Sequence, residues 1–264
     1  MNTDSVSKLF NLDGQVALIT GGSRGLGLQM AIALGEAGAK IMLTSRKAAD
    51  LEEAAGELRS RGIEAQFIAA DASEDSAAQT VVDATMQHFK RIDILVNNAG
   101  ATWGAPAESH PLEAWDKVMN LNARSLFTFS QAAARASMIP NRSGRIINVA
   151  SVAGLGGNPV EMTTIAYNTS KAAAINFTRA LAAEWGKFGI NVNALAPGFF
   201  PTKMTVGLLA EWGVENVTKA APLGRLGNDE DLKGATLLFA SAAGRHITGQ
   251  VLAVDGGVSC VVGG

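Results

Sequence analysis

Short apolar runs alternate along this chain with longer runs whose apolar residues recur every three or four positions. The short runs are almost continuously apolar, which is typical of strands that are covered on both faces. Each longer run has one apolar face, which Val82, Met86 and Phe89 form in the segment 76–89. Strands that alternate with helices are joined in parallel by right-handed crossovers. The pattern therefore predicts an α/β fold with a doubly wound parallel sheet of about seven strands and helices on both faces.

The same alternation places each predicted element along the chain. The predicted strands are Val16–Thr20, Ile41–Thr44, Gln66–Ala70, Ile94–Asn97, Arg145–Val149, Asn191–Ala196 and Gln250–Val254. The predicted helices are Leu26–Ala37, Ala48–Arg61, Ser76–Phe89, Pro111–Met138, Tyr167–Phe188 and Asp229–Ala240. No repeat, low-complexity segment or linker divides the chain into unlike halves, so we expect residues 1–264 to form a single domain.

Composition argues against several other classes of protein. A chain of 264 residues, 47% of them hydrophobic, can bury a core without disulfides or a metal. Its net charge of −2 argues against a nucleic-acid or polybasic membrane surface. The start lacks a leader pattern, and Cys260 is the lone cysteine, so we expect a cytoplasmic protein. His88, His110 and His246 show no ligand spacing, and no metal site is expected.

A glycine-rich segment, "TGGSRGLG" (Thr20–Gly27), follows the first predicted strand and opens the first predicted helix. Glycines let the backbone turn sharply and approach a ligand, and a helix N-terminus offers unpaired N–H groups. The spacing is G-x-x-x-G-x-G, with Gly21, Gly25 and Gly27, and no lysine stands where a P-loop requires one. The segment predicts a site for the diphosphate of a dinucleotide. The alternative is a glycine turn that only packs the helix on the strand.

Residues Gly21 to Gly25 also match G-x-S-x-G, the nucleophile elbow of α/β-hydrolases. A hydrolase needs earlier strands and a loop that supplies an oxyanion-hole N–H. Only 15 residues precede Val16 here, so the position of the motif in the chain argues against a hydrolase.

The end of the second predicted strand indicates which dinucleotide is bound. An NAD site usually has a carboxylate there for the ribose hydroxyls. This chain has Ser45, Arg46 and Lys47 instead, and Arg24 lies within the glycine loop. Two guanidiniums suit a ribose 2′-phosphate, which Arg binds through two hydrogen bonds. The segment therefore favours NADP(H) over NAD(H), although each arginine taken alone could be a solvated surface charge.

Tyr167 is the only tyrosine in the chain, and Lys171 follows it by one helical turn on the same face. A phenol has a pKa of about 10, and lowering it by about 2–3 units takes roughly 3–4 kcal/mol of preference for the phenolate. A nearby ammonium and an oxidised nicotinamide ring are both positive and could supply that preference. Ser151 follows the fifth predicted strand, where its hydroxyl could bind a carbonyl or alcohol oxygen. A Tyr–Lys pair on a helix is by itself more often surface decoration, but its occurrence together with the glycine loop favours a chemical role.

Eight short motifs occur in order at the expected strand ends: "TGGSRGLG", "AADAS", "ILVNNAG", "MNLNARS", Ser151, "YNTSK", "LAPGFFPT" and "VLAVDGG". With these motifs the chain resembles the short-chain dehydrogenase/reductase family over essentially its whole length. The resemblance implies a Rossmann-type domain and a catalytic tetrad of Asn122, Ser151, Tyr167 and Lys171. In that tetrad Tyr167 is the general acid or base, and Ser151 orients the carbonyl. Lys171 lowers the pKa of the phenol and holds the ribose, while Asn122 holds a water for proton relay.

The loop, the basic pair and the resemblance together define a cofactor site. Its expected residues are Gly21, Ser23, Arg24, Gly25, Leu26, Gly27, Ser45, Arg46, Asp71, Ala72, Asn98, Ala99, Gly100, Tyr167, Lys171, Pro197, Gly198 and Thr202. Within this set the resemblance implies that Asp71 contacts the adenine, and that Asn98 stabilises the sheet and approaches the ribose. Thr202 is expected to bind the carboxamide or the diphosphate.

Two segments are expected to shape the substrate site. Ser151 and Tyr167 are 16 positions apart, a few more than in many relatives, so the loop between them is expected to be enlarged. The segment 199–218 is expected to form a lid. A partly hydrophobic substrate is suggested by the apolar residues of these two segments and by an apolar residue that follows the fourth predicted strand. These residues are Trp103, Met162, Phe199, Phe200, Met204, Leu208, Leu209 and Trp212.

The resemblance is greatest to NADPH-dependent 3-oxoacyl (β-ketoacyl) reductases. Sugar-acid dehydrogenases such as gluconate 5-dehydrogenase, and other ketone or steroid reductases, are alternatives. Phe188 stands where acyl-carrier-protein reductases often have a basic residue, which argues against delivery by a carrier protein. A non-catalytic NADP-sensing protein is a further alternative, but such proteins usually lose the tyrosine or the lysine. The alanine-rich segment Tyr167–Phe188 allows close helix packing, and the resemblance implies a homotetramer.

Overall fold

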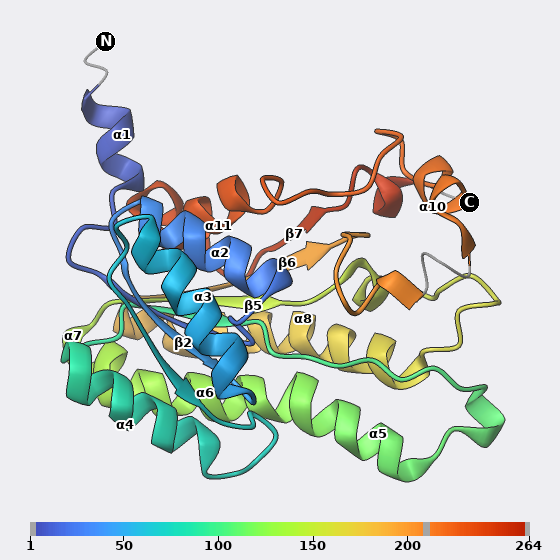
Figure 1. Cartoon of the computed structure of the whole chain (residues 1–264), viewed down its shortest axis with the longest axis horizontal. Helices are drawn as coiled ribbons and strands as arrows, with labels where there is room; N and C mark the ends of the chain where they lie inside the picture. Colours follow the sequence, from blue (N-terminus) through green and yellow to red (C-terminus); the bar gives the residue numbers. More distant parts are fainter. Residues whose placement is uncertain (1–3, 208–211, 262–264) are drawn as a thin grey trace.

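The computed structural model describes residues 4–207 and 212–261, which are built around one parallel sheet (Figure 1). Seven strands pair in the order β3-β2-β1-β4-β5-β6-β7, and every pair is parallel. The strands are β1 (Val16–Thr20), β2 (Lys40–Ser45), β3 (Ala65–Ala69), β4 (Ile94–Asn97), β5 (Gly144–Val149), β6 (Ile190–Pro197) and β7 (Val251–Val254). The predicted doubly wound fold is confirmed, and each predicted strand lies within one residue of its observed bounds.

Helices cover both faces of this sheet (Figure 1). One face carries α2 (Gly25–Glu36), α3 (Ala48–Ser60) and α11 (Lys233–Ala240). The other carries α4 (Ala77–Phe89), α5 (Leu112–Met119), α6 (Ser125–Ala133) and α8 (Ile165–Trp185). Shorter helices are α1 (Asp4–Phe10), α7 (Ile139–Asn141) and α10 (Val214–Lys219). No helix of the described residues is both long enough and apolar enough to span a membrane.

Alternate residues of the central strands pack into different cores. Ala17 and Ile19 of β1 face the α2 side, whereas Leu18 between them faces the α4 side. In β4, Val96 faces the α2 side and Leu95 faces the α4 side. A strand that is buried on both faces must be apolar at every position, which explains the continuous apolar runs in the sequence.

The order of the strands determines where a ligand can bind. The chain passes from β1 outward to β2 and β3, and then returns to the other side of β1 as β4. Helices leave β1 and β4 on opposite faces, so a crevice opens at the carboxyl ends of these two strands. The glycine loop follows β1 and therefore lies at the edge of this crevice.

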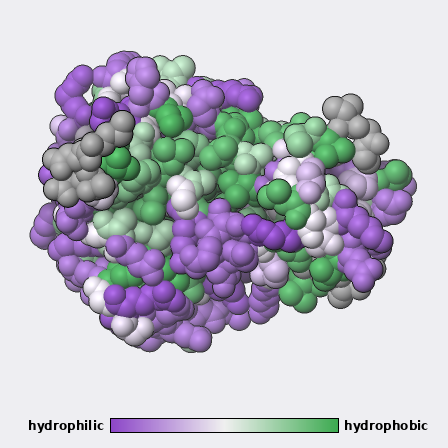
Figure 2. Space-filling model, turned by 90° about the horizontal axis from the view of Figure 1, so that it is seen from above, coloured by the Kyte–Doolittle hydropathy of each residue, from purple (hydrophilic) through white to green (hydrophobic). Residues whose placement is uncertain are grey.

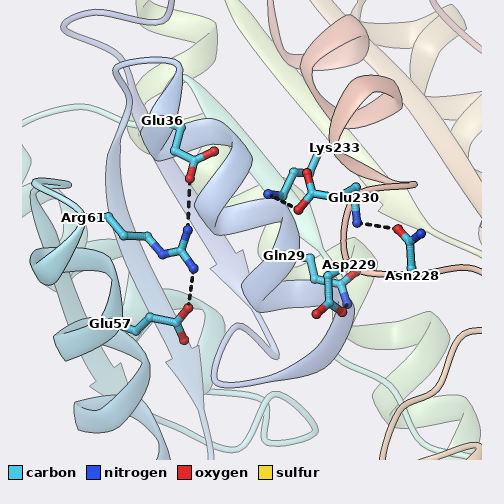
Figure 3. Close-up of polar contacts among 8 residues, drawn as sticks. All are labelled: Gln29, Glu36, Glu57, Arg61, Asn228, Asp229, Glu230 and Lys233. Carbon is cyan, nitrogen blue, oxygen red and sulfur yellow. Dashed lines mark hydrogen bonds and ion pairs between the residues drawn. The ribbon is translucent and has the colours of Figure 1, made fainter.

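The helices α2, α3 and α11 are also joined by polar contacts on their outer surface (Figure 3). Arg61 reaches Glu36 of α2 at 3.1 Å and Glu57 of α3 at 2.9 Å. Gln29 of α2 donates from Nε2 to Asp229 Oδ1, just before α11, at 2.6 Å. These contacts hold the glycine-loop helix against its neighbours on both sides.

Several helical segments differ from the prediction. The helix predicted over 111–138 contains two π-helical turns, Asn120–Arg124 and Ala134–Met138. The helix predicted from Asp229 begins at Lys233, because the Asp231 carboxylate accepts a hydrogen bond from Asn228 N and holds residues 228–232 as a turn. The N-terminal helix α1 was not predicted, since it projects from the domain and contributes little to the apolar core (Figure 1).

Candidate active site

A cleft with a volume of about 1050 Å³ opens at the carboxyl ends of the strands. The glycine loop and the ends of β2, β4, β5 and β6 all contribute to its lining. Every residue predicted to bind the cofactor lines it except Gly27, which lies behind Gly21. Of the predicted tetrad, Ser151, Tyr167 and Lys171 line the cleft, and Asn122 lies just behind its wall.

The glycine loop is shaped by backbone conformation and by Asn98. Gly21 and Gly25 have positive φ angles of 63° and 54°, which favour glycine. A methyl group on Gly27 would collide with the Gly21 carbonyl oxygen and the Asn98 side chain. Asn98 Nδ2 donates to Thr20 O at 3.1 Å and to Gly21 O at 3.0 Å. Asn98 therefore holds the loop as well as the end of the sheet.

The N-terminus of α2 points the unpaired N–H groups of its first turn toward this loop. Arg24 is the N-cap residue and has an extended backbone, and its side chain makes no capping hydrogen bond. A phosphate group can satisfy such N–H groups, and the helix dipole favours its negative charge.

The end of β2 presents hydroxyl groups that lack partners. Thr44 Oγ1 and Ser45 Oγ are buried and make no hydrogen bond, and both residues line the cleft. Arg46 lies beside them and forms no ion pair within the part of the chain that the structure describes. Buried hydroxyls normally have partners, so this end of the cleft is suited to a polar ligand. Together with the glycine cradle, these groups fit a dinucleotide that carries a 2′-phosphate.

One contact at this end was not predicted from the sequence. Arg24 Nη2 forms an ion pair with Asp50 Oδ2 of α3 at 2.6 Å. The sequence showed only that Asp50 lies in the first turn of a predicted helix, and this position did not indicate that Arg24 is its partner.

Asp71 follows β3 and lines the same end of the cleft. Its Oδ1 accepts hydrogen bonds from Ser73 N at 3.0 Å and from Ser73 Oγ at 2.7 Å. Burial alone would raise the pKa of Asp71, but these hydrogen bonds and the charge of Arg46 lower it below its ordinary value. Asp71 is therefore ionised and is held in one orientation.

Ser151, Tyr167 and Lys171 come together in the inner part of the cleft. The Ser151 hydroxyl is near enough to the Tyr167 phenol to act on its pKa. Lys171 Nζ lies 5.6 Å from the centre of the Tyr167 ring and donates to Val149 O at 2.7 Å. Lys171 is only 4% exposed, whereas Tyr167 is partly exposed to the cleft. The phenol thus lies between a hydroxyl and an ammonium group.

Asn122 lies in the first π-helical turn and is linked to the helix that carries Tyr167. Its Oδ1 accepts from Ala101 N at 2.8 Å, and its Nδ2 donates to Ser170 Oγ at 2.9 Å. Ser170 Oγ in turn donates to Tyr167 O at 2.7 Å. Sequence analysis assigned no role to Ser170, because a buried serine inside a helix gives no sign of its partners.

Burial shifts the pKa values of both Tyr167 and Lys171 in the protein without nucleotide. Burial raises the pKa of Tyr167 above its ordinary value, and the hydrogen bond to Ser151 opposes this only in part. Burial also lowers the pKa of Lys171 to about 8. From the sequence, the Lys171 ammonium and an oxidised nicotinamide ring are expected to lower the pKa of the phenol together, and that expectation stays a prediction.

The outer part of the cleft only partly matches the prediction. Phe200 lines the cleft, but it is only 3% exposed and packs in the core that contains Leu232. Trp103 and Met204 are about half exposed, at 45% and 44%. Leu208 and Leu209 lie outside the described residues. The other residues of the segment expected to form a lid, 199–207 and 212–218, follow β6, and their role as a lid stays a prediction.

The enlarged loop between Ser151 and Tyr167 is joined to the first turn of α8. Asn158 Nδ2 donates to Thr164 Oγ1 at 2.8 Å and to Asn168 Oδ1 at 3.0 Å. Ala105 N donates to Thr163 O at 2.9 Å, which connects the loop to the segment after β4. Across residues 4–207 and 212–261, no three His, Cys, Asp or Glu side chains are grouped as a metal would require.

Comparisons with known proteins agree with this geometry. Residues 15–211 match the family model described as short chain dehydrogenase. The gluconate 5-dehydrogenase of Gluconobacter oxydans is 38% identical over 252 residues, which cover 95% of this chain and 97% of that protein. The rhamnolipids biosynthesis 3-oxoacyl-[acyl-carrier-protein] reductase of Pseudomonas aeruginosa is 39% identical over 252 residues, covering 94% and 97% of the two chains.

A solved structure is also similar over nearly the whole chain. The crystal structure of a gluconate 5-dehydrogenase from Burkholderia cenocepacia, in complex with NADP and tartrate, has a TM-score of 0.91 and 36% identity. The match covers 97% of this chain and 100% of that one.

The buried ammonium of Lys171 predicts a particular pH dependence of stability. Its pKa falls from 10.5 to about 8 on folding, so between pH 8 and 10 the unfolded chain binds more protons than the folded chain. The free energy of unfolding should therefore gain a positive slope with pH from this residue. Lys171→Met removes that contribution, and its stability relative to the wild type should decline from pH 8 to pH 10.

Urea unfolding at pH 8, 9 and 10 in the absence of nucleotide measures this slope. Lys187→Met is the matched control, because Lys187 is exposed and follows the same helix. The control should keep the slope of the wild type. A Lys171→Met variant with an unchanged slope would show that the ammonium is not buried in the folded protein.

Proposed function

The chain belongs to the short-chain dehydrogenase family and is an oxidoreductase that acts on CH–OH and C=O groups, and from this premise we propose that it uses NADP(H) to reduce ketones. The observation that carries the proposal is that the Tyr167 phenol, Ser151 and the buried Lys171 ammonium come together in the lining of one cleft. A bound NADP(H) supplies or accepts the hydride, and the protein provides orientation and the proton.

Tyr167 is the proposed general acid in the direction of reduction. Because burial raises its pKa, the phenol keeps its proton at neutral pH and can donate it to the carbonyl oxygen. Ser151 Oγ, next to the phenol, is placed to donate a second hydrogen bond to the same oxygen. In oxidation Tyr167 takes the proton from the alcohol, and the positive charge of the oxidised cofactor then favours the phenolate.

Lys171 and Asn122 are proposed to support this proton transfer. A methyl group on Gly100 would lie 3.3 Å from Asn122 Oδ1 and 3.6 Å from Lys171 Nζ, so both side chains converge on one point of the cleft wall. Lys171 has a pKa of about 8 and can therefore exchange a proton near neutral pH. We assign it to the nicotinamide ribose and to proton relay, with Asn122 holding a water on the path to solvent.

The cofactor assignment is supported by the basic end of the cleft. Arg24 and Arg46, with the unpartnered hydroxyls of Thr44 and Ser45, are suited to a 2′-phosphate. Asp71 is assigned to the adenine. Pro197, Gly198 and Thr202 line the opposite side of the cleft and are assigned to the nicotinamide half and the diphosphate. The Burkholderia cenocepacia relative, whose structure contains NADP, supports the same assignment.

The proposed substrate is a ketone with an apolar portion, such as a 3-oxoacyl compound. The exposed side chains of Trp103 and Met204 near the cleft mouth support this class. A sugar acid is the second candidate. Lys203 lines the cleft beside Thr202, and its ammonium could pair with a carboxylate. The relatives include enzymes named for both substrate classes.

We also propose that the protein forms a homotetramer. Figure 2 shows apolar side chains gathered on the surface of the face that carries α11 and β7 in Figure 1. Leu252 of the edge strand β7 is 37% exposed, and Phe127 of α6, on the other side of the sheet, is 48% exposed. Small-angle scattering should give about four times the monomer mass of 27.3 kDa. A monomeric mass at micromolar concentration would contradict this assembly.

Turnover tests the proposed function most simply. We expect NADPH oxidation with at least one member of a panel that contains an acetoacetyl thioester, a keto-sugar acid, a cyclic diketone and a steroid ketone. Tyr167→Phe should lower kcat by about 10²–10⁴-fold, because general acid catalysis contributes on that order. It should leave NADPH affinity nearly unchanged, since only the hydroxyl is removed.

Thr169→Ala is the matched control, because Thr169 is exposed on the same helix two residues away. Its turnover should equal that of the wild type. Full activity in Tyr167→Phe would overturn the mechanism. NADPH binding without turnover of any ketone or alcohol would instead favour a non-catalytic NADP-sensing protein.

A further inference from the structure

The ion pair between Arg24 and Asp50 lies behind the basic end of the cleft. Arg24 belongs to the glycine loop and lines the cleft, whereas Asp50, in the first turn of α3, does not line it. The Arg24 Nη2–Asp50 Oδ2 distance is 2.6 Å, and the two side chains are 50% and 31% exposed. Asp50 can therefore influence a ligand only through the guanidinium that it holds.

The charges around this pair are unevenly matched. Arg46 and Lys47 line the same end of the cleft and have no carboxylate partner among the described residues. Asp71, another carboxylate that lines the cleft, accepts two hydrogen bonds from Ser73. Of Arg24, Arg46 and Lys47, only Arg24 forms an ion pair among the described residues, whereas Arg46 interacts with the charge of Asp71 without a direct ion pair.

We propose that Asp50 is a positioning residue that weakens binding of the 2′-phosphate. It thereby reduces the ratio of the affinity for NADP(H) to the affinity for NAD(H). This inference rests on the proposed assignment of Arg24 and Arg46 to the 2′-phosphate. A phosphate that reaches Arg24 must share the guanidinium with Asp50. The two anions then lie on either side of one planar group, where they repel each other.

Asp50 has two opposing effects, and their sizes differ. It orients Arg24, but an exposed ion pair contributes little to holding a side chain in place. It also adds a full negative charge about one guanidinium width from a phosphate that carries nearly two. The repulsion therefore exceeds the benefit of orientation. Removing the charge while keeping the hydrogen-bond acceptor should strengthen binding of the phosphorylated cofactor alone.

The test compares Asp50→Asn with the wild type in equilibrium binding. The probes are NADPH, NADH and 2′,5′-ADP, followed by fluorescence for the reduced cofactors and by calorimetry for the nucleotide. Asp50→Asn should bind NADPH and 2′,5′-ADP about three- to tenfold more tightly. Its affinity for NADH should stay within about twofold of the wild type, because NADH lacks the phosphate.

Two variants control for structural effects. Asp50→Glu keeps the charge and should restore wild-type affinity for all three probes. Glu52→Gln removes a charge from the same helix. Glu52 does not line the cleft and pairs with Arg59 at a distance of 3.2 Å, so this variant should change none of the affinities. Unchanged or weaker 2′,5′-ADP binding in Asp50→Asn would overturn the proposal. An equal change in NADPH and NADH affinity would also overturn it.

Arg46→Asp separates this inference from the function on which it rests. If Arg46→Asp weakens 2′,5′-ADP binding and Asp50→Asn does not change it, the 2′-phosphate site stands and the role of Asp50 is wrong. If Arg46→Asp leaves NADPH and 2′,5′-ADP binding unchanged, the 2′-phosphate site itself is wrong, and the inference fails with it.

Discussion

The buried ammonium of Lys171 is the interaction on which the rest of the site depends. Only 4% of its surface is exposed, and its Nζ donates to the Val149 carbonyl at the end of β5. Burying a charge is unfavourable, and the lowering of the lysine pKa to about 8 reflects that cost. The fold tolerates this arrangement because the hydrogen bond joins α8 to the end of β5 beside the phenol. Packing alone would not favour a lysine at this position, because an apolar side chain would fill the space without the cost of burying a charge.

Two buried polar chains keep α8 in the position that Lys171 requires. On one side of the helix, Asn148 Nδ2 donates to Thr178 Oγ1 at 2.9 Å, and Asn97 Nδ2 donates to Asn148 Oδ1 at 2.9 Å. On the other, Asn122 reaches the backbone of Tyr167 through Ser170. Buried polar groups that are fully paired favour one arrangement over all others, because any shift leaves a donor or acceptor unsatisfied. The strands thus determine where the phenol lies, and the glycine loop determines where a dinucleotide could meet it.

Features that arise from local pattern were predictable from the sequence, and those that depend on distant partners were not. The strands are continuously apolar because both faces are buried, and the glycine loop follows from its own spacing, so both were predicted. Many residues that line the cleft follow strand ends, and the predicted cofactor residues other than Gly27 are among them. Asp50 pairs with a residue 26 positions away, and Phe200 is buried only because the lid segment folds back onto the core. The start of α11 was misplaced for the same reason, since its preceding turn is stabilised by side-chain contacts rather than by an apolar pattern.

The central claim is that the protein alone keeps Tyr167 protonated and that a bound oxidised cofactor lowers the pKa of its phenol. The chain contains one tyrosine, so its phenolate absorbance can be titrated without interference from another tyrosine. In the absence of nucleotide we expect the phenol to ionise above its ordinary value of about 10, because burial dominates. With saturating NADP⁺ the pKa should fall by about 2–3 units, since the nicotinamide charge is added to that of Lys171. An unshifted phenol in the NADP⁺ complex would contradict the account.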